Sequence, residues 1–171
     1  MLVFALILGA VYALSPRTPL APWASGWTGP STGRRCTLDA VLDGDSLRLR
    51  CQGESVEVRL HCIDAPEYEQ APWGKQSRRH LVAITPRRLE LAAMETDRFG
   101  RTVAKVYTTG ANRRLLNLEQ VVSGNAAVYG QYCSDPAFAQ AERAARAARL
   151  GIWSRPGEQQ TPWVYRHRQG H

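Results

Sequence analysis

The stretch that most constrains this chain is residues 43–67, because turn signals and acidic side chains are concentrated there. It opens on Asp43-Gly44, one of the strongest short-range signals for a β-hairpin. Residues 54–62 then alternate apolar and polar side chains, as a half-buried strand does, and Pro66 stops that strand. The stretch also carries three carboxylates and a guanidinium that could meet in space: Asp45, Arg59, Asp64 and Glu67.

The remaining periodicity predicts a small α+β domain. Alternating apolar residues indicate five strands, at residues 36–42, 45–51, 54–62, 88–95 and 101–107. Capping signals and apolar spacing indicate three helices, at residues 73–84, 115–123 and 134–150. On the second helix, Leu115, Leu118 and Val122 lie on one side. The order of elements favours a five-stranded oligonucleotide-binding (OB-type) antiparallel barrel with three helices.

The four cysteines are expected to form two disulfides. If Asp43-Gly44 is a two-residue hairpin loop, Cys36 lies directly opposite Cys51, and opposed strand residues about 5.5 Å apart are within disulfide range. Cys62 and Cys133 then remain as the second pair, by elimination. An even number of cysteines agrees with export to an oxidising compartment.

The ends of the chain differ in composition from its centre. The apolar run of residues 2–14 is shorter than the roughly 20 residues that a membrane-spanning helix needs, so residues 1–14 favour a signal peptide, with an uncleaved membrane anchor or a misassigned start as alternatives. Residues 15–33 have the composition of a linker, residues 34–154 should form the domain, and residues 155–171 are a polar tail in which Pro162-Trp163 is a candidate for docking. A secreted or periplasmic protein is expected, or one anchored to the membrane by the N-terminal segment.

The net charge of +7 comes almost entirely from arginine, because Lys75 and Lys105 are the only lysines. Guanidinium groups suit phosphates, so the charge favours a polyanionic partner, DNA or RNA, without deciding the function.

The acidic cluster suggests a hard-metal site. Asp43 is best explained as a turn residue, but Asp45 falls on the same side as the apolar residues of its strand and needs a partner or a cation there. Together with Asp64 it offers the anionic oxygen ligands that calcium requires, and no histidine or cysteine cluster favours a softer metal. Glu67 could lie beside the ion and orient or deprotonate a water molecule.

Two arginines could complete a phosphate site. Arg59 points outward from the third strand, close in sequence to the acidic cluster, and Arg101 follows the turn at residues 97–100. A metal ion with two guanidinium groups is what the stabilisation of a pentacoordinate phosphate would take.

Several motifs resemble the staphylococcal nuclease (thermonuclease) family, in the family's order and at fitting spacings over residues 36–154. They are Asp43-Gly44-Asp45-Ser46, Arg59-Leu60, Ile63-Asp64-Ala65-Pro66-Glu67, Asp97-Arg98-Phe99-Gly100-Arg101 and Gly151-Ile152-Trp153-Ser154. The tail segment Pro162-Trp163-Val164-Tyr165-Arg166 also resembles the tails of exported bacterial members.

The resemblance implies a five-stranded barrel with three helices and calcium-dependent cleavage of DNA and RNA that leaves 3′-phosphates. It implies Asp45, Asp64 and the backbone carbonyl of Ala65 as metal ligands, Glu67 as the residue that activates water, and Arg59 and Arg101 as phosphate clamps. The chain departs from the family's pattern mildly at Ser46 and Ala65. Phe99 replaces a frequent tyrosine and lacks its hydroxyl near the phosphate, and the family's tyrosines after the fifth strand are only loosely matched, by Tyr129 and Tyr132.

Two other functions are compatible with parts of the sequence. A catalytically silent nucleic-acid-binding barrel would use a basic groove and aromatic residues, but it has no need of three carboxylates that repel phosphate. A disulfide-stapled structural module would explain the cysteines and leave the acidic cluster without a role. We therefore expect a monomeric nuclease that acts on DNA or RNA and needs no stable protein partner.

Overall fold

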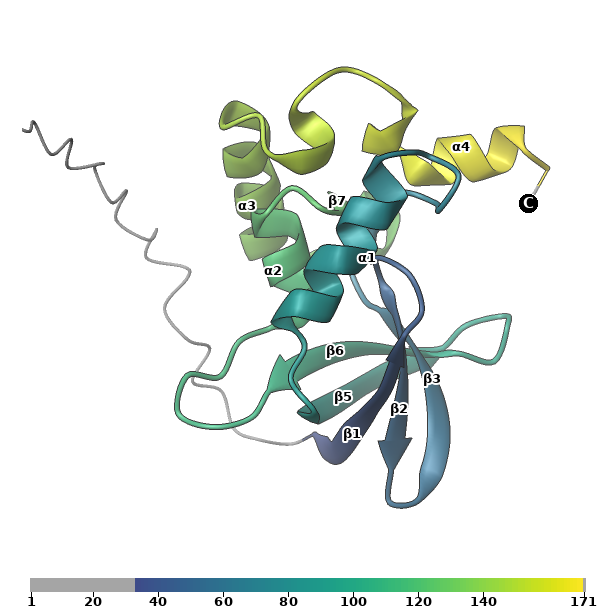
Figure 1. Cartoon of the computed structure of the whole chain (residues 1–171), viewed down its shortest axis with the longest axis vertical. Helices are drawn as coiled ribbons and strands as arrows, with labels where there is room; N and C mark the ends of the chain where they lie inside the picture. Colours follow the sequence, from purple (N-terminus) through teal and green to yellow (C-terminus); the bar gives the residue numbers. More distant parts are fainter. Residues whose placement is uncertain (1–32, 171) are drawn as a thin grey trace, which may run out of the picture.

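Five strands close into a barrel in the computed structural model, which describes residues 33–170 (Figure 1). The strands of the chain are β1 (Arg34–Val41), β2 (Ser46–Cys51), β3 (Glu54–Leu60), β4 (Ile63–Asp64), β5 (Arg88–Thr96), β6 (Thr102–Thr108) and β7 (Ala127–Val128). The helices are α1 (Trp73–Ile84), α2 (Leu116–Val122), α3 (Pro136–Ala147) and α4 (Pro162–Arg168), with 3₁₀ turns η2 (Gly130–Tyr132), η3 (Gly151–Trp153) and η4 (Glu158–Gln160). The expected leader at residues 1–14 and linker at residues 15–33 lie outside the described residues, apart from Gly33.

The barrel is an OB-type barrel, as predicted, but it is not antiparallel throughout. Its strand order is β1-β2-β3-β6-β5, and β3 pairs with β6 in parallel. The other four neighbouring pairs are antiparallel. A closed ring of five strands cannot alternate direction all the way round because five is an odd number. One parallel pair is therefore required by closure, and it falls where the chain leaves the first three strands and returns after α1.

The hairpin of β1 and β2 confirms the predicted cysteine pairing and corrects the predicted loop. Cys36 lies opposite Cys51, and the two form a disulfide. The register then shifts by one residue between Leu38 and Ala40, so Leu47 lies opposite Val41 and not opposite Ala40, where a two-residue loop would place it. The loop is therefore longer than Asp43-Gly44, and the irregularity in β1 restores the register at the cysteines.

A short second sheet holds the end of the acidic stretch. The strand expected at residues 54–62 ends at Leu60, and Cys62 takes a left-handed backbone conformation with φ of 72°. Ile63 and Asp64 then pair with β7, and the Cys62–Cys133 disulfide, which elimination had predicted, lies beside them. Asp64 is thus fixed in two ways, by a strand pairing and by a disulfide two residues upstream.

Helix α2 lies where it was predicted, and its apolar residues pack on the core. Leu115 is buried, and Leu118 and Val122 are partly buried against the core. The fully buried polar residues of α2 are Asn117 and Gln120. The amide of Asn117 accepts a hydrogen bond from the Val106 amide of β6 and donates to the carbonyl oxygens of His61 and Ala104.

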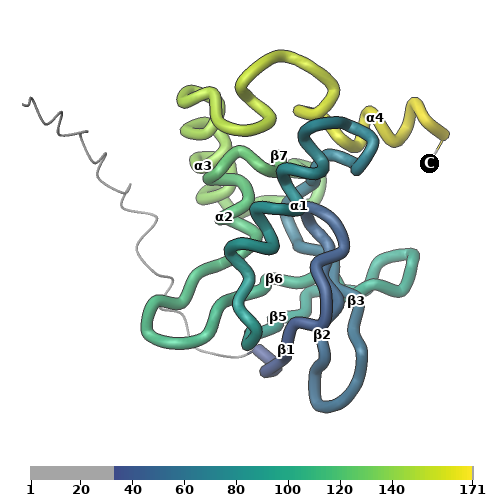
Figure 2. Tube along the Cα trace, in the orientation of Figure 1, coloured from purple at the N-terminus to yellow at the C-terminus, as the bar shows by residue number. Residues whose placement is uncertain are grey.

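The tail beyond residue 154 is structured and forms a fourth helix, one more than expected. The Cα trace carries the chain from α3 across the other helices to α4 on the opposite side (Figure 2). Pro162 is buried, and the Trp163 ring stacks on Tyr129 with ring centroids 5.2 Å apart and planes inclined by 8°. The candidate docking of Pro162-Trp163 is therefore confirmed. Within residues 33–170, no helix is both long enough and apolar enough to cross a membrane.

Candidate active site

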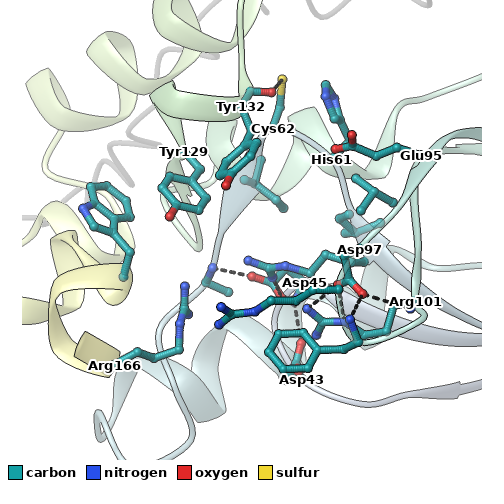
Figure 3. A pocket seen from close by; sticks show the side chains of 18 of the residues that line it. Asp43, Asp45, His61, Cys62, Glu95, Asp97, Arg101, Tyr129, Tyr132 and Arg166 are labelled. Atoms are coloured by element: carbon teal, nitrogen blue, oxygen red, sulfur yellow. Dashed lines mark hydrogen bonds and ion pairs between the residues drawn. The ribbon is translucent and has the colours of Figure 1, made fainter. Parts of the chain in front are cut away.

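The predicted site residues meet at a cleft of about 710 Å³ (Figure 3). The loop after β1, the end of β3, the segment after β4, the β5–β6 hairpin and α4 all contribute to its walls. The cleft is lined by five of the six predicted metal-binding and catalytic residues: Asp45, Arg59, Ala65, Glu67 and Arg101. The sixth, Asp64, is fully buried and reaches the site through its ion pairs.

Asp45 is held inward by local hydrogen bonds. It is 4% exposed, and its carboxylate accepts hydrogen bonds from the Ala65 amide at 2.6 Å and from the Ser46 hydroxyl at 3.2 Å. The exposed Asp43 accepts from the Asp45 amide at 2.9 Å, which is an Asx turn that shapes the loop. Asp43 therefore has the structural role that the turn signal predicted.

The loop that presents Asp45 is packed against the helices through Gly44. A Cβ atom at this position would lie 2.1 Å from the Ser77 hydroxyl and 2.5 Å from the Ala65 side chain, so only glycine fits. The Gly44 carbonyl accepts a hydrogen bond from Gln120 of α2 at 2.6 Å. Gln120 also contacts His80 on α1. Sequence reasoning missed this residue because a glutamine in a short helix usually indicates a solvent-facing position.

We expect Gln120→Met to destabilise the protein by about 1–3 kcal/mol, because the buried Gly44 carbonyl would lose its donor at nearly constant side-chain volume. Urea unfolding measures the change. The matched control is Gln76→Met on the exposed side of α1, which should lie within about 0.5 kcal/mol of the parent protein. Equal stability of the two variants would show that the contact with Gly44 does not hold the loop.

Arg59 bridges the two aspartates of the cluster. Its guanidinium forms an ion pair with Asp45 and another with Asp64, the latter at 2.5 Å. The Arg59 side chain is 14% exposed and both carboxylates are buried. Two buried carboxylates that share one cation must lie close together, and each is costly to bury without such a partner.

Glu67 is bound by an arginine that sequence reasoning had not assigned to the site. Arg166 of α4 donates to the Glu67 carboxylate at 2.6 Å and to both oxygens of Asp64 at 2.9 Å. Burial would lower the pKa of Arg166, but the charge of Asp64 and the hydrogen bond to Glu67 outweigh it, so the pKa lies above its ordinary value. The only sequence signal for Arg166 was the tail motif, which does not indicate the direction of its arginine side chain.

Arg101 reaches the cleft from the β5–β6 hairpin, on the far side of the site from α4. Its guanidinium is paired with Asp97 at 2.8 Å, and the same carboxylate accepts from the backbone amides of Phe99 and Arg101. Burial works against ionisation of Asp97, yet the hydrogen bonds from Arg101 and the backbone hold its pKa below the usual value. The predicted turn therefore exists, and Asp97 fixes both the turn and the arginine.

The donor set suits a hard cation. Within residues 33–170, no group of three or more histidine, cysteine, aspartate or glutamate side chains converges tightly enough to hold a metal by itself. Calcium, however, also accepts backbone carbonyl and water oxygens, so two carboxylates suffice as the anionic part of its shell. Asp45 and Asp64 can supply these two carboxylates. Both are buried beside the guanidinium of Arg59, and Asp45 lines the cleft.

Aromatic rings form another wall of the cleft. Tyr129 and Tyr132 are in edge contact, with ring centroids 5.0 Å apart, and Trp163 stacks on the Tyr129 ring. His61 also lines the cleft, and burial together with the charge of Lys105 lowers its pKa below the ordinary value. Stacked rings beside arginines are the usual elements of single-strand recognition.

Several proteins with related sequences are named as nucleases. The family profile described as "Staphylococcal nuclease homologue" matches residues 57–155. An "Uncharacterized endonuclease" of Haemophilus influenzae is 39% identical over 121 residues, which are 70% of this chain and 66% of that protein. The "Micrococcal nuclease" of Shigella flexneri is 37% identical over 136 residues, covering 74% of this chain and 76% of that protein. For an "Uncharacterized endonuclease" of Escherichia coli O157:H7 the identity is 35% over 131 residues, with coverages of 75% and 82%.

The segment matched by the family profile contains only part of the candidate site. It includes Arg59, Asp64, Glu67 and Arg101, but it begins after Asp45 and ends before α4.

Proposed function

Because the chain belongs to the staphylococcal nuclease homologue family, and is accordingly a phosphodiester-hydrolysing endonuclease, we propose that it is a calcium-dependent nuclease that cleaves DNA and RNA and leaves 3′-phosphates. The observation that carries the proposal is the pair of buried carboxylates, Asp45 and Asp64, joined by Arg59 at the edge of the cleft. A binding module would gain nothing from anions at the place where phosphate must approach.

The metal would be held by the two aspartates and the Ala65 carbonyl. Nucleases of this family depend on a metal ion, and calcium is the proposed ion because every candidate ligand is a hard oxygen. When bound, calcium supplies positive charge that polarises the phosphate and stabilises the negative charge developing on it.

The chain's own residues would divide the remaining work. Glu67 orients the attacking water and takes its proton while the water oxygen forms a bond to phosphorus. The bond between phosphorus and the 5′-oxygen breaks, so the phosphate remains on the 3′ side, and the 5′-oxygen takes a proton from a solvent water molecule as it leaves. Arg59 and Arg101 donate hydrogen bonds to the phosphoryl oxygens, which carry more charge in the transition state than in the substrate.

The proposed setting is outside the cytoplasm. Two disulfides within the described residues agree with a secreted or periplasmic protein, since such bonds persist in oxidising compartments. We extend the proposal to a monomeric enzyme whose only macromolecular partner is its substrate.

A nuclease assay with single-stranded DNA tests the proposal when calcium, magnesium and chelator are compared side by side. We expect hydrolysis with calcium, none with chelator, and recovery when calcium is restored. Mass spectrometry of the products should find 3′-phosphates. Hydrolysis that is indifferent to chelator would contradict the metal assignment, and tight binding without cleavage under every condition would favour a silent nucleic-acid-binding barrel.

A further inference from the structure

We propose that α4 is part of the substrate site and that Arg166 is a third phosphate-binding arginine, which the carboxylates of Asp64 and Glu67 hold until a cation binds Asp64. The inference rests on the proposed function, because it needs a cation at Asp64 and a phosphate in the cleft. It adds an element that lies beyond the matched residues 57–155.

The position of α4 is set by its own contacts and not by Arg166 alone. Pro162 is buried at the start of the helix, and Trp163 stacks on Tyr129 at 5.2 Å. Gln159, just before α4, is buried and donates to the carbonyl oxygens of Ile152 and Arg155. The helix is therefore anchored at its beginning, and Arg166 projects from it toward the acidic cluster.

Arg166 occupies the oxygens that a cation would need. It binds both oxygens of Asp64 and one of Glu67, so its guanidinium supplies the positive charge at this end of the site. A divalent ion on Asp64 would compete for the same lone pairs. The ion and the guanidinium would also repel each other at close range. Occupation of the site by a cation therefore weakens the hold on Arg166.

The released guanidinium would remain where the substrate arrives. The side chain of Arg166 is 30% exposed and lines the same cleft as Arg59 and Arg101. In the close-up view Asp45 lies between Arg166 on one side and Arg101 on the other (Figure 3). Arg59, which is expected to bind phosphate, is likewise paired with two carboxylates in this structure. A planar guanidinium can exchange a bidentate carboxylate for a bidentate phosphate with little change in geometry.

The test compares Arg166→Gln with Arg168→Gln in the full-length protein. Arg168 is a matched control because it lies on the same helix and pairs with the exposed Glu158 instead of with the acidic cluster. Calorimetric titration with calcium alone measures cation binding without substrate. Steady-state cleavage of single-stranded DNA at several salt concentrations measures KM, kcat and the salt dependence of kcat/KM.

Arg166→Gln should bind calcium about threefold to tenfold more tightly, because a competing charge-assisted contact is gone. It should also raise KM about tenfold with kcat changed far less, since a phosphate contact kept throughout the reaction contributes uniform binding. The slope of log(kcat/KM) against log salt should become shallower by about 0.7, the loss of one phosphate contact on a single strand. Arg166→Lys should recover part of KM, and Arg168→Gln should resemble the parent in every readout.

The failures are distinguishable. A parent protein that neither binds calcium nor cleaves DNA would defeat the proposed function itself. An active parent with an Arg166→Gln variant that matches Arg168→Gln would defeat only the role of Arg166. Tighter calcium binding with KM and salt slope unchanged would also overturn the inference, because Arg166 would then be a counter-ion and not a phosphate ligand. Failure of Arg166→Lys to recover any KM would point to a structural role and would count against it.

Discussion

Replacing Glu67 by glutamine is expected to lower kcat by about 10²-fold or more while leaving the fold intact, because a positioned general base typically contributes that much. The side chain is partly exposed and its amide replacement can still accept a hydrogen bond from Arg166, so folding should be affected little. Single-turnover cleavage of single-stranded DNA with saturating calcium measures the chemical step directly, separate from product release.

The matched control is Glu69→Gln, which removes the same charge from an exposed position two residues along the same loop. We expect it to retain nearly full turnover. Calcium-stimulated cleavage by Glu67→Gln at the parent's rate would remove Glu67 from the mechanism. Equal losses in both variants would mean that the loop contributes general negative charge and no specific base.

Removal of the Cys62–Cys133 disulfide, with both cysteines changed to alanine, is expected to lower the free energy of unfolding by about 4 kcal/mol. The cross-link joins residues 71 apart in sequence, and a loop of that size loses much chain entropy in the unfolded state when it is closed. Urea unfolding monitored by tryptophan fluorescence gives the change. Activity should fall as well, because the disulfide lies two residues before Asp64.

The Cys36–Cys51 disulfide supplies the comparison. It spans only 15 residues, so its removal should cost about 3 kcal/mol in the same chain-entropy model. This disulfide is also farther along the chain from the acidic residues than Cys62–Cys133 is, so its removal should lower activity less. A larger loss of stability from the Cys36 and Cys51 variant than from the Cys62 and Cys133 variant would contradict the ordering by loop length.

Much of the fold could be predicted because its signals are local. Helix α1 begins and ends at the predicted residues, and the capping residue Asp135 starts α3 as expected, accepting a hydrogen bond from the Ala137 amide. The hairpin pairing of Cys36 with Cys51 was also correct. The loop length in that hairpin was wrong because an irregularity in β1 shifts the register, and one extra residue in a strand leaves no distinctive pattern in the sequence.

The burial of two polar residues of α2 could not be predicted, for a different physical reason. Periodicity assigns apolar side chains to the core, but this helix also packs against backbone groups of the barrel and of the loop before β2. Asn117 and Gln120 are buried because they satisfy those groups, and a buried carbonyl without a donor costs more than an apolar contact gains. Which backbone groups need partners depends on how the elements come together.

The sequence by itself determined which chemistry to expect of this protein. Asp45, Asp64 and Glu67 with a nearby arginine are the groups from which we propose an oxygen-rich cation site and a base. The tertiary structure decided how the groups are arranged: the parallel pairing that closes the ring of strands, the delivery of Arg101 from a hairpin, and the contact of Arg166 with Asp64, 102 residues away in sequence. Such contacts follow from closure and long-range packing, and an arginine in a polar tail looks the same in the sequence whether it faces solvent or an active site.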